Sequence, residues 1–391
     1  QVLFSNAGYA TYGAGKLFHH REGFIDRRGW TEFFIRSAEQ RRAGWPLSSW
    51  PRDSDVLPEP FPYSPYNEGK EITGGLFMEW GPVLNENGEK MADTIWANHA
   101  AELVGRQHDQ PFFVAVGVYA PHFPNYVPQK YFDMYDPAEI EGVEIREEDI
   151  DDLSERIQRQ ARGRYAIQKR LEEVDAVTAA HHGYLASITY ADAMLGRVLD
   201  ALESGPNADN TIVVVWSDHG YHRGEKLHWG KHKLWERTSN VPFIWAGPGI
   251  EQGASVTATA SLIDMLPTFN ELCDLGDAQP RDGVSLASTL RDTSTAEDRK
   301  VLLPGMVPEE YAVMSEDYRY IRYRDGAEEL YDLRADPNEW HNLAQDARYA
   351  SVIAEYAAAG PAEFARPGLV ARRDLRLVTE GEDYRWEPKG N

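Results

Sequence analysis

The chain has one cysteine, a deficit of positive charge and no long hydrophobic run. The single Cys273 excludes an intrachain disulfide framework and therefore says little about compartment. The segment Phe112 to Ala120 is among the longest apolar stretches, and it has the length of a strand rather than of a helix that crosses a bilayer. No transmembrane segment is therefore expected.

Basic residues are the minority, with 40 Lys and Arg against 63 Asp and Glu and a formal net charge of −23. Proteins that bind nucleic acid present a basic face to the phosphates, so nucleic acid is not expected as a partner. The 391 residues, 42% of them hydrophobic, are enough to bury a large core. The composition predicts a globular protein with one large domain and a smaller one.

One segment departs from this acidic background. It follows the apolar, β-branched run 212–216, which predicts a buried strand. Ligands of open α/β sheets bind just beyond the carboxyl ends of strands, so a binding pocket for an anion is predicted here. Between residues 218 and 233 the only acids are Asp218 and Glu225, whereas the basic side chains are His219, His222, Arg223, Lys226, His228, Lys231, His232 and Lys233.

Two other predicted strands also end in reactive side chains. Residues 10–14 lead to Lys16 and His19, and residues 112–119 lead to His122. The apolar spacing of residues 182–202 predicts an amphipathic crossover helix between strands. Strands that alternate with helices predict an α/β fold, with a mostly parallel sheet sandwiched by helices. We therefore expect these strand ends to gather at one edge of the sheet, although they are far apart in sequence.

The pattern changes after about residue 275. Residues 311–315, 318–324 and 329–333 read as short strands joined by turns, followed by a helix at 346–359. They predict a smaller C-terminal subdomain with an antiparallel sheet. We therefore expect an α/β domain over 1–274 and a C-terminal subdomain over 275–391.

Several short motifs carry a family resemblance. The segment Gly8-Tyr9-Ala10-Thr11 leads through Gly15-Lys16 to His19, and it resembles the second signature of the sulfatase family, which belongs to the alkaline-phosphatase superfamily. The Lys-x-x-His spacing and the Asp218-His219 pair are similar to the iduronate-2-sulfatase-like branch. The resemblance covers essentially the whole chain, because the motifs occur in the order of the family. The further motifs that resemble the family are Glu79-Trp80-Gly81-Pro82, Ser217-Asp218-His219-Gly220-Tyr221, Gly224-Glu225, Trp229-Gly230-Lys231, Val241-Pro242 and Leu330-Tyr331-Asp332-Leu333 with Asp336-Pro337, Glu339 and Asn342-Leu343.

The resemblance implies a sulfatase that hydrolyses sulfate esters of a sugar or polysaccharide with a formylglycine nucleophile and one calcium ion. Lys16 and Lys231 would stabilise the negative charge of the transition state, together with the metal. His122 and Lys231 would face the bridging oxygen. His19 would take the proton that releases sulfate, a task that suits a group titrating near neutral pH.

The resemblance also implies the binding residues. Asp218 would bind calcium through carboxylate oxygen, which this hard cation prefers. His219 as its neighbouring ligand rests on the match with the family alone. Tyr221 and His222, which follow the metal pair, would face the substrate. By the same analogy the protein would be periplasmic or secreted.

The nucleophile motif of the family, Cys or Ser followed by x-Pro-x-Arg, is absent from the chain. Cys273 lies in a helical context without those neighbours, and Ser49-Trp50-Pro51-Arg52 brings its arginine one position early. An earlier pair of metal-binding aspartates is also absent, and Gln1 opens a segment typical of the end of a helix. We therefore expect an N-terminally truncated sulfatase that does not turn over sulfate esters alone.

Other interpretations stay open. Ala120 stands where close relatives often have Lys before Pro-His, which bears on substrate preference. A phosphate or phosphonate ester hydrolase of the same superfamily, or a non-catalytic protein that binds sulfated glycans, would share much of the pattern. Lys226 and Lys233 are expected to be solvated rather than functional.

Overall fold

The computed structural model describes residues 1–18, 26–34, 66, 78–365, 375–380 and 383–389. These residues form two compact units, the first of residues 1–142 and 167–211 and the second of residues 143–166 and 212–391. The domain boundary expected at residue 274 would place the C-terminal antiparallel sheet in a subdomain of its own. This division stays a prediction.

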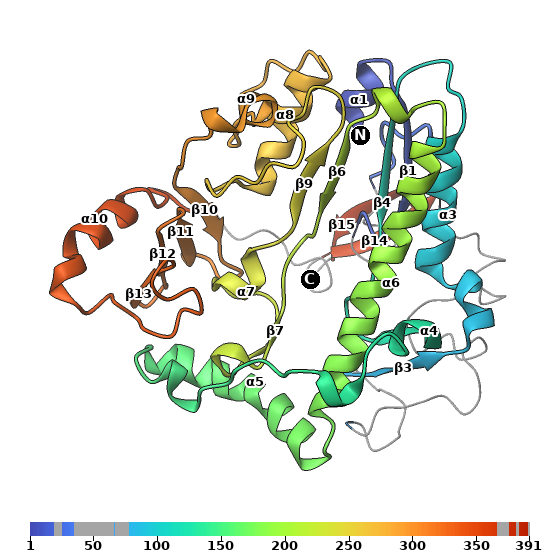
Figure 1. The fold of residues 1–391 in the computed structure, drawn as a ribbon. Helices are drawn as coiled ribbons and strands as arrows, with labels where there is room; N and C mark the ends of the chain where they lie inside the picture. The colour runs from blue at the N-terminus through green and yellow to red at the C-terminus, as the bar shows by residue number, and fades with distance from the viewer. Residues whose placement is uncertain (19–25, 35–65, 67–77, 366–374, 381–382, 390–391) are drawn as a thin grey trace. The chain divides into compact units, whose positions relative to one another are not determined.

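The first unit contains a parallel sheet of order β2-β1-β4. The central β1 (Ala10–Gly15) pairs with β4 (Phe112–Gly117) from Ala10 opposite Phe112 to Gly15 opposite Gly117, and with the short β2 (Glu32–Phe34) on its other side. The helix α3 (Ala92–Gly105) packs on β1 and β4 (Figure 1). The strands predicted at 10–14 and 112–119 are confirmed.

A second parallel pair in this unit joins β3 (Trp80–Val83) to β5 (Asn125–Pro128). The long helix α6 (Val177–Glu203) packs on α3 and on both of these strands. Gly183 permits the close contact, because a Cβ there would lie 2.6 Å from the Cβ of Trp80. The crossover helix predicted at 182–202 is therefore confirmed, with a start several residues earlier.

The second unit holds the strand predicted after residue 212, β6 (Val213–Trp216), and β9 (Phe243–Ala246). These two strands pair antiparallel, whereas strands of the first unit pair in parallel. The sequence predicted β6 but not this antiparallel pairing, because an apolar run carries no information on the direction of its strand.

The C-terminal antiparallel sheet is confirmed. Its order is β10-β11-β12-β13, and α10 (Ala350–Ala358) packs on β11 and β12. Its apolar face joins a core with Ile157, Ala161 and Tyr165 of α5 (Glu155–Glu173). The segment 144–175 is rich in charged residues, but one apolar stripe of its helix is buried. The sheet strands are β10 (Val301–Pro304), β11 (Tyr311–Met314), β12 (Tyr318–Arg322) and β13 (Glu328–Asp332).

Among the residues described above, no helix has both the length and the apolar character needed to cross a membrane. A terminal hairpin, β14 (Leu375–Glu380) with β15 (Asp383–Pro388), completes the described strands.

Candidate functional site

In the first unit, Lys16 and His122 lie beyond the carboxyl ends of β1 and β4. The Lys16 backbone N–H donates to the Gly117 carbonyl at 2.8 Å, which continues the pairing of the two strands. The Lys16 ammonium lies 5.6 Å from the centroid of the Tyr119 ring, and the Tyr119 hydroxyl lies 3.2 Å from His122 Nδ1. The parallel register therefore brings both predicted residues to one tyrosine. His19 lies outside the described residues, and its role stays a prediction.

The imidazole of His122 has a defined orientation. Its Nδ1 lies 2.6 Å from the Phe123 carbonyl oxygen, so Nδ1–H is the donor in this contact. Asn125 donates from Nδ2 to the Pro121 carbonyl at 2.9 Å and holds the other side of the same loop. Proton exchange with a ligand therefore falls to Nε2.

A buried carboxylate that the sequence did not predict anchors this loop. Asp93, in the first turn of α3 and 3% exposed, accepts the backbone N–H of Tyr119 at 2.9 Å and of Ala120 at 3.0 Å. Burial raises the pKa of Asp93 to about 6, although both hydrogen bonds and the charge of Lys16 act in the opposite direction. The only signal in the sequence is an acid at the start of a helix, which is common for other reasons.

In the second unit, three predicted residues come together. Asp218 and His219 follow β6, and the antiparallel hairpin of β7 (His222–Arg223) and β8 (Trp229–Gly230) then returns the chain to Lys231. The Lys231 ammonium lies 2.7 Å from His219 Nε2, which is 3.6 Å from Asp218 Oδ1. Because the hairpin reverses the direction of the chain, it brings Lys231 back beside His219.

The Asp218–His219 pair fits a partial set of metal ligands. His219 Nδ1 lies 2.9 Å from the Gly220 carbonyl, so Nδ1–H donates there and Nε2 carries the lone pair. That lone pair accepts from the Lys231 ammonium, and a metal bound at Nε2 would replace this contact. The Asp218 carboxylate is largely exposed. Two donors are fewer than the six to eight that calcium takes, and the described part of the chain holds no group of three or more candidate ligands.

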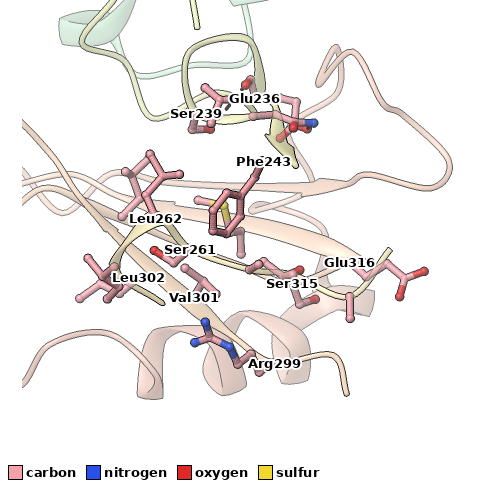
Figure 2. A pocket seen from close by; sticks show the side chains of 18 of the residues that line it. Glu236, Ser239, Phe243, Ser261, Leu262, Arg299, Val301, Leu302, Ser315 and Glu316 are labelled. Carbon is pink, nitrogen blue, oxygen red and sulfur yellow. Dashed lines mark hydrogen bonds between the residues drawn. The ribbon is translucent and has the colours of Figure 1, made fainter. Parts of the chain in front are cut away.

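A hollow of about 1550 Å³ in the second unit is lined by Asp218, His219 and Lys231 among others. Figure 2 shows another part of its wall, where Phe243 and Leu262 face Val301 and Leu302 across the space, with hydroxyl and charged side chains beside them. The polar residues labelled there are Glu236, Ser239, Ser261, Arg299, Ser315 and Glu316. A ligand held at Lys231 therefore has room on this side for further groups.

His222 lies in the interior of the second unit, whereas Tyr221 is half-buried. The His222 side chain is 1% exposed, its Nδ1–H donates to the Glu225 carbonyl at 3.1 Å, and its ring packs edge-on against His228 and Trp235. Burial lowers the pKa of His222 well below its usual value. These contacts favour a packing role, and the substrate contacts of both residues stay predictions.

The prediction that Lys226 is solvated is wrong. Lys226 is 2% exposed and forms an ion pair with the buried Asp149 at 2.7 Å. Its backbone has a positive φ of 53° in the turn Glu225–Leu227 of the hairpin, and the side chain enters the core there. Lys233 is half-buried rather than solvated, and burial lowers its pKa. Cys273 ends α8 (Met265–Leu272), and Ser49–Arg52 lies outside the described residues.

Solved structures share the fold at low sequence identity. A phosphonate monoester hydrolase from Silicibacter pomeroyi superposes with a TM-score of 0.69 at 19% identity, over 91% of this chain and 78% of that chain. A putative sulfatase from Bacteroides thetaiotaomicron superposes with a TM-score of 0.61 at 24% identity, over 91% of this chain and 72% of that chain. At these identities the likeness shows the α/β fold alone, and it confirms the predicted fold class.

A family model shows the family, and sequence relatives agree with it. A protein named "Sulfatase" from Formosa agariphila is 32% identical over 364 residues, which are 90% of this chain, and the chain spans 66% of its length. A "Delta 4,5-hexuronate-2-O-sulfatase" from Bacteroides thetaiotaomicron is 36% identical over 195 residues, 45% of this chain and 40% of that protein. Residues 224–359 match the family "N-sulphoglucosamine sulphohydrolase, C-terminal", and residues 2–275 match the family "Sulfatase". The chain belongs to the sulfatase family, as its motifs predict.

Proposed function

We propose that the chain is part of a sulfatase that hydrolyses sulfate esters of sugars or polysaccharides. The observation that carries the proposal is the cluster of Lys231, His219 and Asp218 beside a large hollow, with 2.7 Å between the ammonium and the imidazole. An ammonium next to a candidate metal pair is suited to a group as strongly anionic as sulfate. The named substrate of a relative, a hexuronate 2-O-sulfate, supports a sulfated sugar as the ligand.

In this proposal the residues predicted from the family resemblance divide the work on the sulfate ester. The Lys231 and Lys16 ammonium groups stabilise the negative charge that develops on the sulfate oxygens in the transition state. His122 donates a proton from Nε2 to the leaving alcohol oxygen, while its Nδ1–H stays on the Phe123 carbonyl and fixes the ring. His19 takes the proton whose loss releases sulfate.

Two groups complete the proposed site. A formylglycine made from a Cys or Ser outside this chain would supply the nucleophile, since the chain holds no modification motif. Asp218 and His219 would hold one calcium ion, with two aspartates outside this chain, and the ion would add positive charge beside the sulfate. Export to the periplasm or beyond is proposed by analogy with the family.

The experiment compares esters that differ only in the transferred group. The complete gene product is assayed with an aryl sulfate, the matching aryl phosphate and a 2-O-sulfated uronate. We expect sulfate esters to be preferred, and Lys231→Ala to lower kcat on them by roughly 10²–10³, the loss typical of removing one charge-stabilising donor. The control is Lys90→Ala, because Lys90 is an exposed lysine whose ammonium donates a hydrogen bond to Asn87 Oδ1. A preference for the phosphate ester would refute the proposal.

A further inference from the structure

The hairpin that precedes Lys231 is fixed at its tip by buried charges. Lys226 donates from its backbone N–H to Asp149 Oδ2 at 3.2 Å, and its ammonium lies 2.7 Å from Asp149 Oδ1. The same ammonium donates to the backbone carbonyl of Glu339. Lys226, Asp149 and Glu339 are 2%, 4% and 2% exposed, so water does not compete for these contacts.

The chain that follows Lys231 is fixed by the other end of the same glutamate. The backbone N–H of Glu236, at the start of α7 (Glu236–Ser239), donates to Glu339 Oε2 at 2.8 Å. Arg319 lies 2.8 Å from Glu339 Oε1, pairs with the Glu236 carboxylate and donates to the Leu234 carbonyl at 3.0 Å. Glu339 therefore contacts the chain on both sides of Lys231, through its carbonyl before it and its carboxylate after it.

The backbone of Glu339 itself is in an unfavourable conformation. Its φ of 57° lies in the left-handed region, which residues with a Cβ adopt rarely and at a cost in free energy. The conformation allows the carbonyl to reach Lys226 while the carboxylate reaches Glu236. Such strain persists only where surrounding contacts determine it.

These contacts bear on the candidate site through the hairpin register. His222 pairs with Gly230 at the base of the hairpin, so Lys231 leaves the hairpin opposite Tyr221 and reaches His219. A lysine side chain is long and flexible, and a small displacement of its backbone changes where the ammonium lies. Fixing residues 226 and 236 limits that displacement.

From these contacts we propose that Glu339 is a positioning residue for Lys231. We name Asp149, Lys226, Glu236, Arg319 and Glu339 the Glu339 network. Glu339 does not touch the reacting atoms; it holds the hairpin and the turn between which Lys231 stands. The inference rests on the proposed sulfatase function, because it assigns Glu339 to the same reaction.

A double-mutant cycle tests the proposal in the complete gene product. Glu339→Gln keeps the volume and the carbonyl contact but loses the carboxylate, and we expect it to lower kcat roughly tenfold with little change in KM. In a Lys231→Ala background the same substitution should have no further effect, because Glu339 acts through Lys231. An equal tenfold loss in both backgrounds would overturn the proposal.

A matched control separates positioning from stability. Asp264 is also a buried acid of the second unit, fully buried and paired with Arg299, and it contacts none of the Glu339 network in the described structure. Asp264→Asn should lower Tm at least as much as Glu339→Gln, and any change it causes in kcat should be the same in the unsubstituted and Lys231→Ala backgrounds. If Glu339→Gln behaves like Asp264→Asn in both backgrounds, Glu339 has only a structural role.

Two further measurements keep the test decisive. Should the complete protein hydrolyse no sulfate ester, the proposed function fails, and amide hydrogen exchange at residues 229–231 still tests the positioning. We expect faster exchange there in Glu339→Gln and not in Asp264→Asn; equal exchange in both refutes the proposal. Should Glu339→Gln not fold, the paired variant Asp149→Asn with Lys226→Met removes both buried charges and should show the same accelerated exchange.

Discussion

The loop that carries His122 and the hairpin that leads to Lys231 are anchored by buried acids in different ways. Asp93 holds the loop of the first unit through two backbone N–H groups. Asp149 holds the hairpin of the second unit through a backbone N–H and a buried ammonium, within a network of several charges. Asp93 can still accept these hydrogen bonds when its carboxyl group is protonated. Protonation of Asp149, in contrast, would leave the buried Lys226 ammonium without a counter-charge.

In both units burial has the largest effect on the pKa of the buried acid, so the two anchors differ in their partners. Burial raises the pKa of Asp93 to about 6 and of Glu339 to about 7, even though Arg319 lies beside Glu339. An ion pair in the interior thus offsets only part of the desolvation. The loss of stability should therefore be largest when the charged partner of a buried acid is removed. It should be smallest when a single hydrogen bond beside an anchor is lost.

The largest effect is expected when the buried cation is removed from the second unit. Lys226→Met leaves Asp149 without its ammonium in the interior, and we expect the free energy of unfolding to fall by about 3–5 kcal/mol. Denaturant unfolding measures the change. The control Lys90→Met alters an exposed lysine and should stay within about 0.5 kcal/mol. A loss below about 1 kcal/mol for Lys226→Met would show that the ion pair is dispensable.

A smaller effect, with a defined dependence on pH, is expected for the first unit. The pKa of Asp93 rises from 3.8 to about 6 on folding, so its favourable contribution is present below pH 3.8 and is lost as the pH rises through 6. A difference of that size corresponds to about 3 kcal/mol, and it accumulates between about pH 4 and pH 7. The Asp93→Asn variant lacks this titration.

Unfolding of the chain and of Asp93→Asn is therefore compared between pH 4 and pH 8. Relative to the variant, the unsubstituted chain should lose stability over this interval. A constant difference across the interval would show that Asp93 is already ionised in the folded protein at pH 4. An effect of opposite sign would show that its two hydrogen bonds outweigh burial.

The sequence predicted the residues that follow apolar strands and missed those that hold them. Lys16, His122, Asp218 and Lys231 stand next to recognisable strands or motifs, and the structure places them at strand ends or beside the hairpin. Asp93 and Lys226 could not be predicted, because a charged residue in a single sequence reads as exposed. Lys226 meets Asp149 across 77 positions, and only the folded chain makes that pair visible.

The smallest effect is expected at Tyr119, which contacts both predicted residues of the first unit. Its hydroxyl donates to the Phe123 carbonyl at 3.2 Å and lies at the same distance from His122 Nδ1, while its ring lies under Lys16. Tyr119→Phe removes the hydroxyl contacts and keeps the ring and both backbone hydrogen bonds to Asp93. We expect a loss of about 0.5–1.5 kcal/mol in denaturant unfolding, the usual net contribution of one hydrogen bond. A loss as large as that of Lys226→Met would mean that the Tyr119 side chain, rather than the buried Asp93 carboxylate, anchors the loop of His122. The contrast between the two anchors would then disappear.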